Sequence, residues 1–183
     1  MHIFYRCYIV KNVYKPAKKR GIREMEKVKT FLADISDLLN EKNYQKIYEK
    51  VPAFRQEKAD RLKHREDQAQ SVGAWYLWMK IQERHKIPQD AGQSFNLSHS
   101  GKYVLCSAGV SGERVGCDIE YMRKYHERLA EKYFCSSEYE RIRNADEAER
   151  TEMFYRYWVL KESFLKATRK GLVMGLNTSE IQI

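Results

Sequence analysis

The stretch VGCDIEY, residues 115–121, combines the alternation of a β-strand with two carboxylates in an otherwise apolar run. Side chains two positions apart on a strand point to the same side, so Asp118 and Glu120 share one face. The apolar positions face the opposite side, toward an expected core: Val115, Cys117 and Ile119. Two neighbouring carboxylates repel each other unless a cation neutralises them, which suits Mg²⁺. A solvated edge strand whose outer face carries two acids is the alternative.

A second charged motif is WVLKESFLK, residues 158–166, within a run that has the spacing of a helix. Trp158, Glu162 and Lys166 lie four positions apart and therefore share one helix face. A third carboxylate followed one turn later by a lysine suits a metal-bound diphosphate, because it offers a ligand and a cation for the leaving phosphate. The alternative is an ordinary surface pair worth a few tenths of a kcal/mol.

The third motif is FNLSHSG, residues 95–101, where a loop is expected to enter a strand. Ser98, His99 and Ser100 offer hydroxyl and imidazole donors suited to a terminal phosphate. Adjacent residues rarely align as nucleophile and base, and no orienting acid lies nearby, so the sequence does not favour a catalytic Ser–His pair. A loop histidine without a function is the alternative.

Periodicity predicts the remaining elements. In chain order they are a strand over 2–10, a basic turn or loop, an amphipathic helix over 24–50, a helical region over 53–85, strands over 103–109 and 114–120 joined by a glycine-containing turn, helices over 125–147 and 151–170, and at most one last strand. Helices and strand pairs without regular βαβ alternation predict an α+β fold.

The 183-residue composition is that of a globular protein, with 43% hydrophobic and 32% charged residues. No run is long enough to span a bilayer, and the N-terminal residues lack the pattern of a signal peptide. The four cysteines form no CxxC pair, which favours reduced thiols and a cytoplasmic location. The net charge of +9 suits an anionic partner, such as a nucleic acid, a phosphorylated cofactor or an acidic protein.

Taken together, FNLSHS (95–100), VGCDIE (115–120) and WVLKESFLK (158–166) resemble the 4′-phosphopantetheinyl transferase superfamily, in its monomeric surfactin-synthetase-activator type. Forty positions separate Asp118 from Trp158, the interval of that signature. The segment KYFCSSEYERI also resembles the family pattern, and DRLKHREDQAQSV resembles its basic helix weakly. The upstream Gly-Lys-Pro segment of the family is not reproduced.

The resemblance implies transfer of the phosphopantetheine arm of coenzyme A to a serine of an apo acyl- or peptidyl-carrier protein, with release of adenosine 3′,5′-bisphosphate. By analogy, Asp118, Glu120 and Glu162 would be the ligands of Mg²⁺, with Mn²⁺ as the other candidate. Glu162 would also deprotonate the carrier serine, directly or through a metal-bound water. Lys166 would neutralise or protonate the leaving phosphate.

The resemblance also implies residues that bind coenzyme A. Ser98 and His99 would contact its 3′-phosphate, with Arg61 as a helper from the basic helix, and Lys161 would lie along the pantetheine. Coenzyme A is a polyanion and carrier proteins are typically acidic, so the positive net charge agrees with both partners. No nucleic acid or membrane is expected as a partner.

The family fold implies two pseudo-symmetric lobes, expected at residues 1–100, with the basic helices, and 101–183, with the metal-site strand and the Lys-Glu-Ser helix. The second lobe would be shortened at its C-terminal end relative to the family. The family implies a monomer, and the short second lobe leaves a dimer as the alternative. A catalytically weakened module that binds coenzyme A or a carrier protein is the alternative function, and a nucleic-acid binder a third.

Overall fold

The computed structural model describes residues 3–10, 28–87, 94–109, 113–169 and 175–183. The strands are β1 (Ile3–Val10), β2 (Val28–Asp34), β3 (Phe95–Ser100), β4 (Tyr103–Gly109) and β5 (Arg114–Tyr121). The α-helices are α1 (Glu41–Tyr48), α2 (Ala53–Asp60), α3 (Arg65–His85), α4 (Glu127–Tyr133), α5 (Ser136–Asn144) and α6 (Glu147–Thr168). Two short 3₁₀ helices, η1 (Ser36–Leu39) and η3 (Leu176–Thr178), complete the described elements. The predicted α+β class is confirmed.

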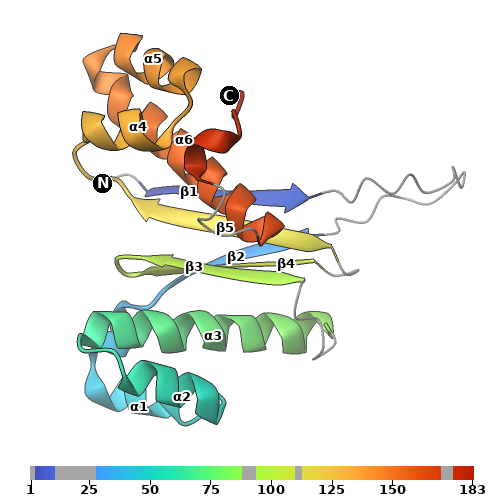
Figure 1. Ribbon diagram of the computed structural model, residues 1–183. Coiled ribbons are helices and arrows are strands. Elements are labelled where there is room, and N and C mark those ends of the chain that lie inside the picture. Colours follow the sequence, from blue (N-terminus) through green and yellow to red (C-terminus); the bar gives the residue numbers. More distant parts are fainter. Residues whose placement is uncertain (1–2, 11–27, 88–93, 110–112, 170–174) are drawn as a thin grey trace, which may run out of the picture.

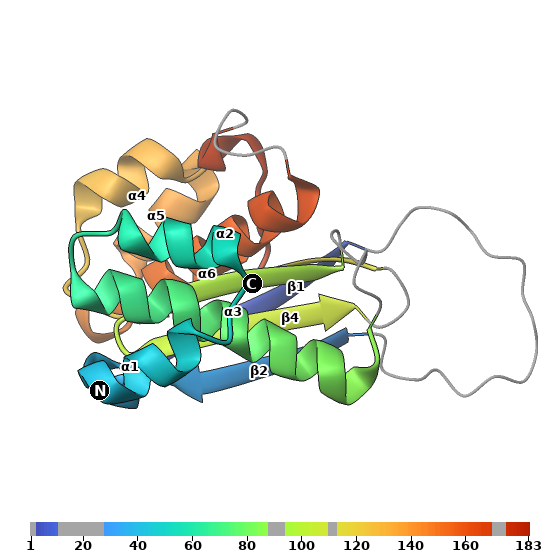
Figure 2. The same ribbon diagram turned by 90° about the horizontal axis from the view of Figure 1, so that it is seen from below.

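The strands form two sheets that lie between two groups of helices (Figure 1). Strands β1 and β5 pair antiparallel, and α6 packs on both of them. The other sheet has the order β2-β4-β3, and α3 packs on β3 and β4. Figure 2 shows α3 lying across this sheet with α2 beside it. Strand β5 lies next to β3 and β4, so the two sheets share an interior.

Strand β4 is buried on both faces because it lies between these layers. On one face Cys106 and Ala108 pack with Trp78 of α3. On the other face Leu105 packs with Cys117 and Ile119 of β5. The apolar face predicted for the 115–121 strand is therefore a core face, which confirms the alternation. Asp118 on the opposite face is buried too, which contradicts a solvated outer face.

The predicted helix over 24–50 is wrong for residues 28–40, which contain β2 and η1, and is confirmed only for α1. Phe31 and Ala33 are partly buried while Leu32 between them is exposed, the two-residue period of a strand. Pairing of the whole of β2 with β4 stabilises this strand, and a helical reading of the local sequence does not include that distant partner.

The predicted strands over 103–109 and 114–120 are confirmed, but they do not pair with each other. Strand β4 pairs with β2 and β3, whereas β5 pairs with β1. The turn expected around residues 111 and 112 lies outside the described residues, as does the basic segment 11–27. The lobe boundary expected after residue 100 falls at the β3–β4 turn and stays a prediction.

Three further predictions can be compared with the structure. The helical region predicted over 53–85 is confirmed and consists of α2 and α3, separated by residues 61–64. The described C-terminal residues contain η3 and no strand. Within the described residues, no helix is both long and apolar enough to cross a membrane.

Candidate functional site

Glycine 116 brings helix α6 close to strand β5. A Cβ atom at this position would lie 2.0 Å from the Ser163 carbonyl oxygen and 2.4 Å from the Ala167 nitrogen. Only glycine allows this approach of the two backbones. Because Gly116 shares a strand face with Asp118 and Glu120, the same close contact places both carboxylates against the helix that carries Glu162 and Lys166.

Asp118 lies at the centre of a buried polar cluster. Lys166 Nζ lies 2.6 Å from Asp118 Oδ1 and also donates to Ser98 Oγ at 3.0 Å. The Ser98 hydroxyl donates to the same Asp118 oxygen at 2.8 Å. Only 4% of the Asp118 side chain is exposed, against 29% for Lys166. The structure thus brings together residues from the three sequence motifs.

The negative charge of Asp118, Glu120 and Glu162 is only partly balanced by hydrogen-bond donors and cations. Asp118 Oδ2 is buried without a hydrogen-bond partner. Burial, followed by the negative charge of Asp118, raises the pKa of Glu120 and that of Glu162. The Ser100 hydroxyl offers Glu120 a long hydrogen bond of 3.3 Å. A further cation at this position would relieve all three carboxylates.

The chemistry of these donors fits Mg²⁺, a hard cation that prefers carboxylate oxygens. Asp118, Glu120 and Glu162 supply three carboxylates, and one buried oxygen has no protein donor. Among the described side chains, however, no three acidic, histidine or cysteine groups are gathered closely enough to hold a metal ion. Lys166 contacts Asp118 instead, so binding of an ion by all three carboxylates requires side chains to move.

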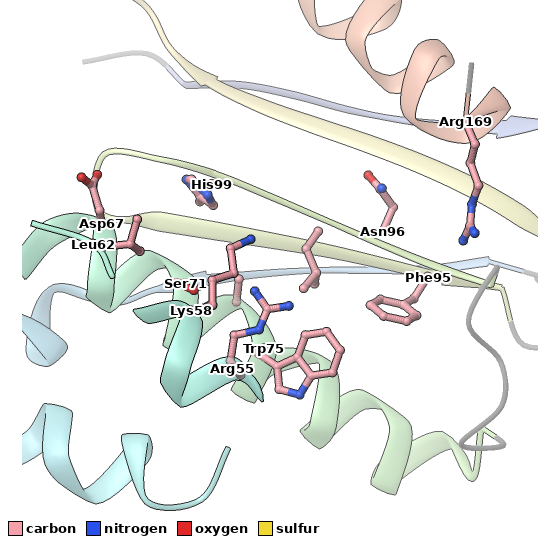
Figure 3. Close-up of a pocket in the computed structure, with 12 residues that line it drawn as sticks. Arg55, Lys58, Leu62, Asp67, Ser71, Trp75, Phe95, Asn96, His99 and Arg169 are labelled. Carbon is pink, nitrogen blue, oxygen red and sulfur yellow. The ribbon is translucent and has the colours of Figure 1, made fainter. Parts of the chain in front are cut away.

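A cavity of about 540 Å³ lies on the other side of β3, between that strand and helices α2 and α3 (Figure 3). Arg55 and Lys58 of α2 and His99 of β3 line it. The Arg55 guanidinium stacks over the Trp75 ring at 4.3 Å from its centroid. Two buried polar atoms of the cavity wall, Arg55 Nε and Ser71 Oγ, have no hydrogen-bond partner. The cavity therefore suits a polar, anionic ligand.

His99 is accessible from this cavity, and its walls remove part of the water from the ring. Burial lowers the pKa of His99, and the positive charges of Lys166 and Lys58 lower it further. The imidazole is therefore predominantly neutral at pH 7 and can donate one hydrogen bond and accept another.

The side chains of Ser98 and His99 lie on opposite sides of β3. Ser98 is buried against Asp118, whereas His99 lines the cavity. This follows from the strand conformation of residues 95–100, in which neighbouring side chains alternate. The expectation of a loop that presents both donors to one phosphate is corrected by this placement.

Lys161 lies away from both the acidic cluster and the cavity, contrary to the expectation that it lines the pantetheine. Its side chain is only 2% exposed and forms an ion pair of 2.7 Å with the fully buried Glu138. Its ammonium also donates to the carbonyl oxygens of Leu176 and Ser179, at 2.8 and 2.6 Å. On a helix, adjacent residues face different directions, so Lys161 points to the C-terminal segment and not with Glu162.

Arg61 is an exposed residue at the C-terminal end of α2 and does not line the cavity. Lys58 and Arg55, about one and two turns earlier in the chain, line the cavity instead. Their three-residue spacing on a short basic helix was the available signal, because residues i and i+3 share a face. Sequence motifs alone did not indicate Arg55 and Lys58, because His99, which lines the same cavity, is at least 41 positions away in sequence.

Residues 114–183, which contain β5 and α6, match the sequence model of the 4′-phosphopantetheinyl transferase superfamily. The match covers less than half of the chain, and the chain is similar to curated transferases of the Sfp type. It is 34% identical over 97 residues to the 4′-phosphopantetheinyl transferase Sfp of Bacillus subtilis, covering 53% of this chain and 42% of Sfp.

Two other relatives are also 4′-phosphopantetheinyl transferases. The 4′-phosphopantetheinyl transferase HetI of a Nostoc species is 39% identical over 85 residues, covering 45% of this chain and 35% of HetI. The 4′-phosphopantetheinyl transferase ffp of Bacillus subtilis is 27% identical over 163 residues, covering 79% of this chain and 72% of ffp. The chain thus spans less than half the length of Sfp and of HetI.

Proposed function

We propose that the chain transfers the 4′-phosphopantetheine arm of coenzyme A to a serine of an apo acyl- or peptidyl-carrier protein, the activity of a holo-[acyl-carrier-protein] synthase. The observation that carries the proposal is the cluster of Ser98, Asp118 and Lys166, with Glu162 on the same helix as the lysine. Phosphoryl transfer depends on positioning and neutralisation of charge more than on covalent chemistry, and this cluster provides both.

The cationic cavity is proposed to bind the nucleotide end of coenzyme A. Arg55 and Lys58 would contact its 3′-phosphate, together with the neutral imidazole of His99. Arg55 is pre-organised for this contact because its guanidinium is stacked on Trp75. Ser98 is proposed to act on the other side of β3, where it orients Lys166 and Asp118.

In the proposed reaction, the carrier serine oxygen attacks the phosphorus atom that bears the pantetheine. The bond from that phosphorus to the bridging oxygen breaks, and adenosine 3′,5′-bisphosphate leaves. Burial and the charge of Asp118 raise the pKa of Glu162, which strengthens Glu162 as a base for the serine proton. Lys166, displaced from Asp118, would neutralise the charge that develops on the leaving phosphate.

Asp118, Glu120 and Glu162 are proposed to hold Mg²⁺ or Mn²⁺. When bound, the ion would supply positive charge to the diphosphate. Its binding would also satisfy the buried Asp118 Oδ2.

The test is labelling of several purified apo acyl- and peptidyl-carrier proteins with a fluorescent coenzyme A, with Mg²⁺ and with EDTA. Mg²⁺-dependent labelling of at least one carrier is expected, together with its loss in Asp118→Ala and Glu162→Ala. Glu152→Ala is the matched control, because Glu152 is an exposed acid on the same helix, far from the cluster. It should label at the wild-type rate.

Folded protein that labels no carrier would contradict the proposal. If calorimetry then showed tight binding of coenzyme A without turnover, the chain would be a binding module rather than a transferase. Equal loss of labelling in Glu152→Ala would show that the variants act through folding and not through the site.

A further inference from the structure

Helix α6 ends in a residue with an unusual backbone conformation. Arg169, which follows the last helical residue Thr168, has φ 56° and ψ 18°, in the left-handed region. Its N–H donates to the Leu165 carbonyl at 3.0 Å and closes the helix. Glycine is the usual residue at such a position, because a Cβ atom is unfavourable there. In this chain an arginine occupies a backbone conformation that favours glycine.

The Arg169 side chain lines the cavity described above. Figure 3 shows it extending from the end of α6 toward Phe95 and Asn96, at the end of the cavity away from Asp67 and His99. Arg55 and Lys58 reach the cavity from α2, on the opposite wall. A ligand between these walls would have cations on both sides.

The charges of the cavity lining strongly favour an anion. Three side chains with permanent positive charge line it, Arg55, Lys58 and Arg169, and one carboxylate, Asp67. A guanidinium is well suited to phosphate because its planar fork can donate two parallel hydrogen bonds.

The position of Arg169 also connects the cavity to the acidic cluster. Lys166, three residues earlier on the same helix, contacts Asp118. The last turn of α6 therefore supplies one cation to the cluster and the next cation to the cavity. An elongated ligand with several phosphates could contact both.

We propose that Arg169 is a binding residue for a phosphate of coenzyme A, and that the strained end of α6 is kept because it directs this guanidinium into the cavity. The inference rests on the proposed ligand, coenzyme A. It assigns to this chain a contact from α6 in addition to those of α2 and β3.

The experiment is calorimetric titration of coenzyme A into the wild type and two Arg169 variants. Arg169→Gln removes the charge and keeps the backbone strain, whereas Arg169→Gly removes the charge and relieves the strain. Both variants should raise the dissociation constant for coenzyme A about tenfold, the loss of affinity expected when one charge-assisted contact is removed. Arg169→Gly should melt no lower than the wild type, and Arg169→Lys should bind within about threefold of it. In the labelling assay KM for coenzyme A should rise while kcat stays within about twofold.

Lys86 provides the matched control. It ends α3 with φ 52°, it is also a basic residue in the left-handed region, and it lines a different cavity. Lys86→Gly should therefore leave the affinity for coenzyme A unchanged.

Arg169→Gln with wild-type affinity would overturn the inference, as would an affinity loss that Arg169→Gly does not reproduce. If the wild type itself did not bind coenzyme A, both the inference and the proposed function would fail. Wild-type binding with an unaffected Arg169→Gln variant would contradict the inference alone.

Discussion

Helix α6 contributes two lysines, Lys161 and Lys166, that each form an ion pair with a carboxylate of another element. The two pairs differ in how many of their polar atoms have a hydrogen-bond partner. The Lys161 ammonium has three oxygen acceptors, Glu138 and the carbonyls of Leu176 and Ser179. Glu138 in turn accepts from the backbone N–H groups of Cys135 and Ile181, at 2.9 and 2.7 Å. No polar atom of this closed pair is left without a partner.

The pair of Lys166 and Asp118 is open by comparison. One Asp118 oxygen is buried without a partner, and more than a quarter of the Lys166 side chain is exposed. All polar atoms of a closed pair are already bonded within the protein, so such a pair stabilises the fold and does not bind a ligand. An open pair can exchange its lysine for another cation, so a buried ion pair indicates chemistry only where some of its groups are unsatisfied.

Breaking the closed pair should have the largest effect on stability. In Lys161→Met the buried Glu138 loses its counter-charge, which should lower the free energy of unfolding by about 3–5 kcal/mol. Urea denaturation followed by circular dichroism measures it. Adding Glu138→Leu should recover part of the loss, because the buried charge is then removed too. A single variant within about 1 kcal/mol of the wild type would show that the closed pair does not fix the fold.

Disturbing the contact that supports the open pair should have an intermediate effect. Gly116→Ala forces α6 away from β5 and should cost about 1–3 kcal/mol, as overpacking of a tight core does. The nearest atoms to the new Cβ are the backbone atoms of Ser163 and Ala167. A second substitution, Ala167→Gly, should therefore not restore the melting temperature. Full rescue would place the conflict at the Ala167 side chain instead.

Changing the open pair itself should affect stability little. Asp118→Asn removes a buried negative charge from a side chain that has one oxygen without a partner. Because Lys166 is partly exposed, its ammonium can turn to solvent. The free energy of unfolding should therefore change by less than about 1 kcal/mol. Carrier labelling should nevertheless fall on the order of a hundredfold or more. A loss of stability as large as that of Lys161→Met would remove the distinction between the two pairs.

The smallest effect concerns pH. The pKa of Glu162 is raised in the folded protein, so this group favours folding below its unfolded pKa, and that contribution is lost as pH rises through the folded value. At pH 7, Glu162→Gln should therefore be slightly more stable than the wild type, by less than about 0.5 kcal/mol given its partial exposure. Melting temperatures of the two proteins should converge below the ordinary glutamate pKa. A variant less stable at pH 7 and equal at low pH would reverse the sign and contradict the repulsion.

The sequence predicted what depends on short-range periodicity. Strand β5 and helix α6 were recognisable from two- and four-residue spacing, whereas the proximity of Asp118 and Lys166 followed only from the family resemblance. Strand β2 was not recognisable, because its stability comes from pairing with β4, whose paired residues lie 69 to 81 positions away in sequence. The position of Lys161 was not predictable either, since its acceptors belong to α5 and to the C-terminal residues 176–179.

The alternation of Ser98 and His99 across β3 has a consequence for the choice of ligand. Strand β3 separates the acidic cluster from the cationic cavity. The separation of these two sites therefore sets a minimum length for a ligand that contacts both. A small anion such as inorganic phosphate can occupy one side of the strand only. A molecule that uses both sides must be long enough to pass the strand and must carry its phosphates at separate points along its length. Selection by length would thus add to selection by charge, without any residue dedicated to it.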